Sequence, residues 1–343
     1  MTSLVEERPV SRSRDATLLE LQQLVVDYGY GERRARAVDG VDLAVREGEV
    51  LGLAGESGCG KTTIANAVMQ ILRAPAHITG GSILFQGEDI VGKSAAELRR
   101  YRWRNVSMVL QSAMSALNPV LRIGDQFVDA MQAHEKINKR QALTRAGELL
   151  ELVGIDGRRV SAYPHQLSGG MRQRVVIAMA LALKPELIIM DEPTTALDVV
   201  VQREILQQIE ALKRDFGFAV LFITHDLSLL LEFADRIAIM YAGEIVESAP
   251  AERFASNPLH PYTQGLLKSF PPLRGPLMRL TGIPGSPPDL RDPPAGCRFN
   301  PRCPHCRPEQ SALYLRQTTE RPLLREVEAG HEVACHLVEG AAQ

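Results

Sequence analysis

Three runs of continuous apolar residues mark the centre of the chain. They cover residues 50–54, 186–190 and 219–224. Uninterrupted apolar runs of this length are typical of inner strands in a parallel sheet, because both faces of such a strand are buried. Between the last two runs lie apolar residues at helical spacing, namely Ile205, Ile209, Leu212 and Phe216. This spacing predicts the crossover helix that a parallel strand pair requires.

Two other patterns flank this predicted core. Residues 18–46 alternate apolar and polar positions and a hairpin pattern covers 82–90, which together predict antiparallel strands. From about residue 94 to 166 the apolar spacing becomes helical. One helix face is formed by Leu143, Ala146, Leu149, Leu150 and Leu152. We therefore predict an α/β protein with a parallel core sheet, an antiparallel β subdomain and an α-helical subdomain.

The ends of the chain differ from its centre in composition. Residues 1–16 are rich in charge and hold no apolar segment, so a frayed tail is expected there and a secretory signal is not. After about residue 257, proline and glycine become frequent. We divide the chain into a disordered tail over 1–16, a core domain over 17–257 with the helical subdomain at about 94–166, and a C-terminal extension over 258–343.

Composition narrows the class of protein. The 343 residues are 45% apolar and carry a formal charge of −2, and no run approaches the roughly 18 apolar residues of a membrane span. Of five cysteines, Cys59 lies near the first apolar run and four fall in the C-terminal extension. This distribution favours a local site over a disulfide framework, and so a cytosolic protein.

A glycine-rich turn follows the first apolar run. Gly55, Gly60, Lys61 and Thr62 match the phosphate-loop pattern G-x-x-x-x-G-K-[ST] in full. Backbone N–H groups turned inward and a helix N-terminus would cradle phosphates, while Lys61 reaches the outer phosphates and Thr62 can ligate Mg²⁺. The residues expected around the phosphates are Gly55, Glu56, Ser57, Gly58, Cys59, Gly60, Lys61, Thr62 and Thr63.

Each of the other two apolar runs is followed by side chains that could act on a phosphate bound at the same site. The run at 186–190 leads into Asp191 and Glu192, and the run at 219–224 leads into His225. We predict that Asp191 holds Mg²⁺ through water and that Glu192 polarises an attacking water. His225 would lie near the same phosphate because it follows the neighbouring strand.

Two further features need a partner. Ser168, Gly169 and Gly170 open a helix whose N-terminus can bind an anion, although the chain already has one phosphate-binding helix start. A second such start requires a second ligand or a second subunit. Gln111 follows a short strand that leads into the helical segment.

In this order and spacing the residues resemble the ATP-binding subunits of ABC transporters. The motifs of that family match Gly55 to Thr62 (Walker A), Gln111 (Q-loop), Leu167 to Gln173 (signature), Leu187 to Glu192 (Walker B), Ala196 to Asp198 (D-loop) and His225 (H-loop). Met171 stands where the commonest signature has glutamine. The resemblance covers residues 18 to about 255 and implies a P-loop ABC ATPase fold with a RecA-like core.

The resemblance also implies how the site is completed. Two ATPase domains would pair head to tail, so that Ser168 to Gly170 of one chain, together with Asp198, complete the ATP site at Lys61 of the other. Tyr28 is similar to the aromatic residue that stacks on adenine in this family, with Tyr30 as the alternative. Catalysis would use Glu192 as base, with His225 and Lys61 stabilising charge and with Thr62, Asp191 and Gln111 around Mg²⁺.

A subgroup is indicated by residues outside the ATP site. Gly55 to Lys61, Asn118-Pro119, His260 to Thr263 and the segment around Gly296 to Pro304 resemble the ATPase subunits of dipeptide, oligopeptide and nickel importers. Such subunits commonly carry a C-terminal cysteine cluster. Cys297, Cys303, Cys306 and Cys335 supply the four thiolates of a [4Fe-4S] cluster, although the spacing from Cys303 to Cys306 is short for this subgroup. Zn²⁺ with histidine substitutes, free thiols and a disulfide remain alternatives.

The resemblance implies a peripheral ATPase at the cytoplasmic face of the cell membrane that drives uptake of di- and oligopeptides. Its expected partners are two transmembrane permeases, a second ATPase subunit and an extracytoplasmic solute-binding protein. Nickel or another small solute is the alternative cargo. An ABC ATPase acting on nucleic acid or ribosomes is disfavoured, because it would be expected to carry a long coiled-coil insertion or a second ATPase cassette, and the sequence shows neither. The single basic run at 99–104 also fits a solvated helix face better than a nucleic-acid surface.

Overall fold

The computed structural model describes residues 16–31, 34–110, 116–195, 197–269, 282–308 and 311–338. Gln111, Ala196 and nearly all of the tail predicted over 1–16 lie outside the described residues.

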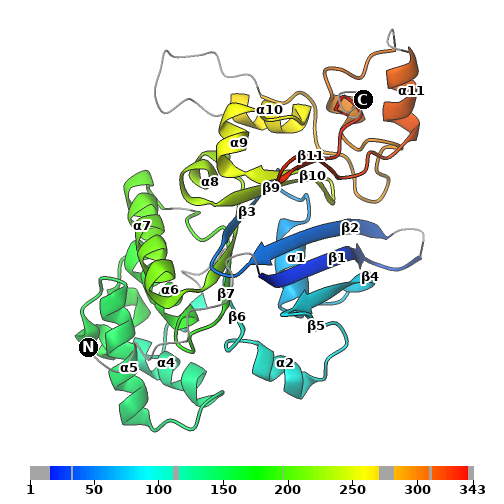
Figure 1. Ribbon diagram of the computed structural model, residues 1–343. Helices are drawn as coiled ribbons and strands as arrows, with labels where there is room; N and C mark the ends of the chain where they lie inside the picture. The colour runs from blue at the N-terminus through cyan, green and yellow to red at the C-terminus, as the bar shows by residue number, and fades with distance from the viewer. Residues whose placement is uncertain are drawn as a thin grey trace.

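Alternating apolar and polar positions near the N-terminus form an antiparallel sheet with the strand order β2-β1-β4-β5 (Figure 1). Its strands are β1 (Thr17–Tyr28), β2 (Ala35–Arg46), β4 (Ala76–Phe85) and β5 (Glu88–Asp89). The antiparallel strands predicted over 18–46 and the hairpin predicted over 82–90 are confirmed.

The continuous apolar runs form the centre of a second sheet, with the order β11-β12-β10-β9-β3-β8-β7-β6. Its main strands are β3 (Val50–Ala54), β6 (Val106–Val109), β7 (Leu187–Asp191), β8 (Ala219–Thr224), β9 (Arg236–Tyr241) and β10 (Glu244–Pro250). From β6 to β9 neighbouring strands are parallel, and β10 pairs antiparallel with β9. The predicted crossover helix is α7 (Val199–Phe216), between β7 and β8.

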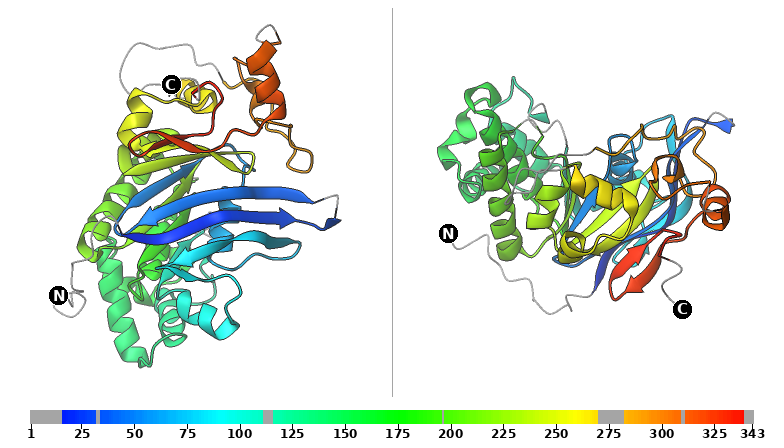
Figure 2. Two further views of the ribbon diagram at one scale, coloured as in Figure 1. Left: turned by 45° about the vertical axis from the view of Figure 1, so that its right-hand side comes forward. Right: turned by 90° about the horizontal axis from the view of Figure 1, so that it is seen from above.

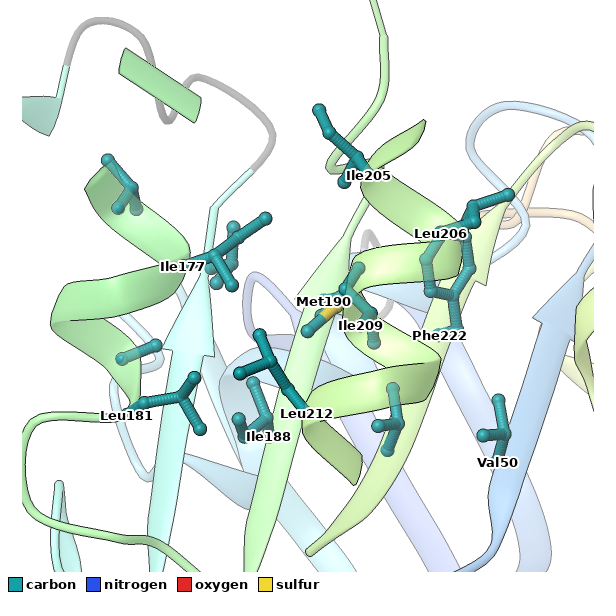
Figure 3. Close-up of a cluster of buried hydrophobic side chains, with 14 of the residues drawn as sticks. Val50, Ile177, Leu181, Ile188, Met190, Ile205, Leu206, Ile209, Leu212 and Phe222 are labelled. Atoms are coloured by element: carbon teal, nitrogen blue, oxygen red, sulfur yellow. The ribbon is translucent and has the colours of Figure 1, made fainter. Parts of the chain in front are cut away.

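Both faces of the central sheet are covered, as its unbroken apolar strands require. Ile188, Met190 and Phe222 face α6 (Gly169–Ala180) and α7, as Figure 3 shows. Alternate residues of the same strands enter a second core that holds α1 (Lys61–Val68) and the antiparallel sheet. Because neither face is free, a ligand must bind beyond the carboxyl ends of the parallel strands.

The described elements between residues 94 and 166 are helical apart from β6, which belongs to the central sheet. Its helical elements are α2 (Ala95–Tyr101), α4 (Ile123–Gln132), α5 (Lys139–Leu152), η2 (Gly157–Ser161) and η3 (Pro164–Gln166). The predicted apolar face of α5 includes the buried residues Ala146, Leu149 and Leu150. The domain boundaries themselves remain a prediction.

The C-terminal extension packs onto the core domain and adds strands to the central sheet. Helices α8 (Leu227–Phe233) and α9 (Ala251–Ser256) precede the extension. The described elements of the extension are α10 (Pro261–Lys268), η4 (Asn300–Arg302), α11 (Ser311–Thr319), β11 (Arg325–Glu328) and β12 (His331–Val333). Strand β12 pairs with β10 and so lengthens the central sheet (Figures 1 and 2). Phe299 is buried in the core that packs on α6 and α7.

Charged pairs also attach the extension to the core. Arg298 of the extension pairs with Asp39 and lies 3.0 Å from Glu244, and Arg321 lies 2.9 Å from the same glutamate. His331 on β12 lies 2.8 Å from Glu247, and both side chains are fully buried. Arg298, Asp39 and Glu244 are largely shielded from water, so removing Arg298 leaves carboxylates with less compensation in a buried place.

Replacing Arg298 with methionine is expected to lower the free energy of unfolding by about 3 kcal/mol, because Asp39 and Glu244 would remain buried with less compensation. Urea unfolding followed by circular dichroism measures the change. Arg291→Met is the matched control, since Arg291 pairs with the exposed Asp289 two residues away and its loss should leave the unfolding midpoint unchanged. Equal midpoints for the two variants would contradict the importance of the buried pairs.

Candidate nucleotide-binding site

The phosphate loop joins β3 to α1 and is held in shape by glycines. Gly60, the N-cap of α1, has a φ of 114°. A Cβ atom placed on Gly60 would lie 2.2 Å from the carbonyl oxygen of Ala37, and one on Gly55 would lie 2.1 Å from that of Met240. Only glycine therefore fits at these two positions, and the loop is pressed against the neighbouring backbone.

Lys61 crosses the inside of this loop. Its Nζ donates hydrogen bonds to the carbonyl oxygens of Gly55, at 2.7 Å, and Glu56, at 3.0 Å, and the residue is 5% exposed. The ammonium group is thus already held within the loop where phosphates are expected. Positioning this charge in advance lowers the entropy cost of binding an anion.

A buried carboxylate lies next to the loop at the end of β7. Asp191 is 2% exposed, and among the residues that the structure describes its Oδ1 has no hydrogen-bond partner. Burial raises the pKa of Asp191, while a hydrogen bond with the Thr62 side chain acts in the opposite direction. A hydroxyl beside an unsatisfied carboxylate oxygen suits Mg²⁺, which uses few protein ligands and takes its others from phosphate and water. Thr62 and Asp191 therefore fit the predicted Mg²⁺ site.

The raised pKa of Asp191 leads to a prediction about stability. An acid whose pKa is higher in the folded state disfavours folding when it is ionised at neutral pH. Asp191→Asn is therefore expected to raise the Tm of the nucleotide-free protein and to abolish Mg²⁺-dependent hydrolysis. Differential scanning calorimetry measures the first effect.

The control for this measurement is Asp198→Asn. Asp198 is exposed and caps α7 by accepting a hydrogen bond from the N–H of Val201, at 3.0 Å. Asparagine is an equally good N-cap, so the Tm of this variant should not change. A Tm that falls in Asp191→Asn would show that the buried carboxylate does not destabilise the empty site.

Glu192 and His225 meet at the ends of neighbouring strands. His225 Nδ1 lies 3.3 Å from Glu192 Oε1, and the Thr195 hydroxyl donates a hydrogen bond to Glu192 Oε2 at 3.1 Å. Glu192 has a φ of 47°, in a region that residues with a side chain rarely adopt. Strain of this kind is found where surrounding contacts fix a functional side chain. The two predicted catalytic groups are therefore adjacent.

The two candidate adenine-stacking tyrosines lie in different surroundings. The hydroxyl of Tyr28, at the end of β1, is 3.3 Å from the hydroxyl of Thr63, which follows the phosphate loop. Tyr30 is 71% exposed and stacks on His77, with ring centroids 4.8 Å apart. The structure thus links Tyr28, and not Tyr30, to the helix that carries the loop.

The residues predicted to act on a second subunit lie at exposed helix starts. Ser168 is exposed and caps α6, accepting a hydrogen bond from the N–H of Met171 at 3.3 Å. Within the described ranges, no hydrogen bond or ion pair joins Ser168, Gly169 or Gly170 to the phosphate loop of the same chain. Val199 and Val200, beside Asp198, are each 67% exposed.

One contact of the loop was missed by the sequence prediction. The N–H of Glu56 donates a hydrogen bond to the hydroxyl of Tyr262, at 2.9 Å, and the Glu56 carboxylate pairs with Arg302. His260 to Thr263 indicated a subgroup, but no local pattern placed Tyr262 at the phosphate loop. The contact spans 206 residues of sequence, so spacing carries no signal of it.

The four cysteines of the extension are free thiols and lie in one region. Burial raises the pKa of Cys297 to about 12 and that of Cys335 to about 11, and the charge of Cys303 adds to both shifts. Cys306 in turn adds to the raised pKa of Cys303. In the part of the chain that the structure describes, however, no group of three or more His, Cys, Asp or Glu side chains has the geometry to hold a metal ion. As arranged, the thiols do not form a metal site.

Comparisons with known proteins agree with this geometry. Residues 38–195 match the family model described as ABC transporter, and residues 246–309 match the model described as oligopeptide/dipeptide transporter, C-terminal region. The oligopeptide transport ATP-binding protein OppD of Bacillus subtilis is 45% identical over 290 residues, which cover 83% of this chain and 81% of OppD. The dipeptide transport ATP-binding protein DppD of the same organism is 41% identical over 329 residues, covering 95% and 96%.

A solved structure extends the comparison to the fold. The dimeric structure of an ATP-binding cassette in a post-hydrolysis state, bound to ADP and Pi, has a TM-score of 0.61 and 28% sequence identity. It covers 68% of this chain and 98% of that cassette. None of the described helices is both long and apolar enough to cross a membrane.

Proposed function

The chain belongs to the family of ATP-binding subunits of oligopeptide and dipeptide ABC transporters, and from this premise we propose that its ATP hydrolysis drives the uptake of short peptides. Hydrolysis is supported by the contact of Glu192 with His225 at the strand ends, at the same edge of the sheet as the phosphate loop. A scaffold subunit would not need this pair. The peptide cargo is supported by the match of residues 246–309 to the oligopeptide/dipeptide transporter C-terminal region.

The proposed reaction is in-line attack of water on the γ-phosphate of ATP. Glu192 takes a proton from the attacking water through its carboxylate, and His225, at 3.3 Å, orients that carboxylate and stabilises developing charge. Lys61 and the loop N–H groups hold the phosphates. Mg²⁺ would neutralise phosphate charge, and Thr62, Asp191 and Gln111 are the residues proposed to hold it, with Gln111 outside the described residues.

We further propose that the ATP site is completed by a second ATPase subunit, either another copy or a paralogue. Ser168, Gly169, Gly170 and Asp198 would contact ATP bound to the partner. The exposure of Ser168 and of the apolar Val199 and Val200 supports this, because such groups suit a surface that another subunit covers. Tyr28 would stack on the adenine.

The remaining partners proposed are two transmembrane permeases and an extracytoplasmic solute-binding protein, with this chain peripheral at the cytoplasmic face. The test is to reconstitute the chain with these partners in proteoliposomes and to measure uptake of a labelled dipeptide and of ⁶³Ni²⁺. ATP-dependent peptide uptake supports the proposal. Uptake of nickel alone would replace the peptide by the alternative cargo. Hydrolysis that responds to DNA or ribosomes but not to permeases would contradict an importer.

A cysteine-bound metal centre is proposed separately from the ATP site. Cys297, Cys303, Cys306 and Cys335 would hold a [4Fe-4S] cluster, with Zn²⁺ as the alternative. The raised pKa values of Cys297 and Cys303, to which neighbouring cysteines contribute, support the proximity of these thiols, but a metal would require the four side chains to rearrange. Anaerobic purification with metal analysis and EPR tests this. A protein with neither iron nor zinc would contradict both versions.

A further inference from the structure

The C-terminal extension contacts the phosphate loop through an ion pair at Glu56. Arg302 Nη1 lies 2.6 Å from Glu56 Oε2, and Nη2 lies 2.9 Å from Oε1, so the guanidinium group pairs with both carboxylate oxygens. The Arg302 side chain is 5% exposed and that of Glu56 is 25% exposed. Two parallel hydrogen bonds of this kind fix direction as well as charge. The Glu56 carboxylate is therefore held in one orientation.

Contacts outside the phosphate loop also hold the Arg302 side chain in place. Its Nε donates a hydrogen bond to the carbonyl oxygen of Pro284, at 2.9 Å. Its guanidinium lies over the ring of Tyr241, 5.7 Å from the ring centroid, on the strand next to β3. These contacts come from the central sheet and from the extension, so Arg302 links the two.

The main chain of the loop is held by the same region. The hydroxyl of Tyr262, on α10, accepts the hydrogen bond from the Glu56 N–H. The rings of Tyr262 and Tyr241 pack 4.6 Å apart, and Phe299 packs on both. Glu56 is thus restrained through its carboxylate and its backbone by residues outside the phosphate-loop motif.

The charge of Glu56 explains why such a restraint matters. The backbone carbonyl oxygen of Glu56 lies 3.0 Å from Lys61 Nζ. The Glu56 carboxylate therefore belongs to a residue that contacts the phosphate-binding lysine. Released from Arg302, the carboxylate would be free to approach Lys61 and would repel incoming phosphates at short range. Arg302 both compensates this negative charge and holds it on the side of the extension.

We propose that Arg302 is a positioning residue for ATP, which keeps the Glu56 carboxylate away from the phosphate cradle. The inference rests on the proposed ATP site at Lys61. It makes the extension a part of the nucleotide site: ATP affinity depends on a contact that the sequence places 246 residues after Glu56.

The test is a double-mutant cycle on the full chain, with the Kd of a fluorescent ATP analogue measured in the presence of Mg²⁺. Arg302→Met is expected to weaken binding by about tenfold, and Glu56→Gln supplies the second single variant that the cycle requires. Adding Glu56→Gln to Arg302→Met should restore most of the affinity, because the repelling charge is gone. Arg307→Met is the control, since Arg307 is exposed and its described contact is a hydrogen bond to the carbonyl oxygen of Pro304.

The reversal separates positioning from a merely structural role. A structural role predicts that the double variant binds as weakly as Arg302→Met, and this result, or an unchanged Kd in Arg302→Met, would overturn the inference. If the methionine variant does not fold, Arg302→Lys replaces it, with smaller weakening and the same reversal expected. Failure of Lys61→Ala to weaken binding would instead contradict the proposed ATP site.

Discussion

Glu192→Gln is expected to lower the rate of ATP hydrolysis by about a thousandfold while leaving ATP binding intact. Glutamine keeps the shape of the side chain and can still accept a hydrogen bond from Thr195, but its amide cannot take a proton from water. If two chains close around ATP as proposed, this variant should accumulate as an ATP-bound dimer. Phosphate release and size-exclusion chromatography with ATP measure the two effects.

The control for this variant is Glu204→Gln on the surface of α7. Glu204 pairs with Arg174, and its side chain is 54% exposed, so hydrolysis should continue at the normal rate. Hydrolysis by Glu192→Gln at that same rate would remove Glu192 from the role of base. An inactive variant that fails to dimerise with ATP would instead challenge the proposed pairing of subunits.

Gly60→Ala is expected to abolish ATP binding. Its Cβ would lie 2.2 Å from the Ala37 carbonyl oxygen and 2.6 Å from Met240 Cε. The first of these atoms belongs to the backbone of β2 and cannot move aside cheaply. The loop must therefore shift, and the N–H groups that hold phosphate shift with it. Titration with a fluorescent ATP analogue measures the loss.

Gly58→Ala provides a matched control within the same loop. Gly58 also has a positive φ, of 80°, but a Cβ there meets no atom within 4 Å. The substitution should cost about 1 kcal/mol of backbone strain and leave ATP binding detectable. If both alanine variants bind ATP equally well, the close approach of Gly60 to Ala37 is not what shapes the loop.

The elements of the fold followed from local pattern. Continuous apolar runs predicted β3, β7 and β8, because strands buried on both faces consist mainly of apolar residues. The motif order then predicted the ABC ATPase fold, which the family model and the solved cassette confirm. Sequence pattern did not place the extension, whose β12 joins the edge of the central sheet through β10. Strand pairing at a sheet edge depends on backbone groups that every residue carries.

The sequence predicted the individual residues of the candidate site but not the contacts between them. The phosphate loop, Asp191, Glu192 and His225 each follow a buried strand, so sequence alone placed them at one edge of the sheet. The left-handed backbone of Glu192 and its contact with His225 became apparent only in the folded structure. The roles of Ser168 to Gly170 and of the four cysteines remain predictions.

By itself the sequence determined the chemistry, because the types and spacing of residues around 55–62, 191–192 and 225 are local properties. Tertiary structure decided which distant residues support that chemistry. Arg302 and Tyr262 reach Glu56 only because β9 and α10 carry Tyr241 and Tyr262 to the phosphate loop. Such contacts arise from packing between elements far apart in the chain, which no local pattern records.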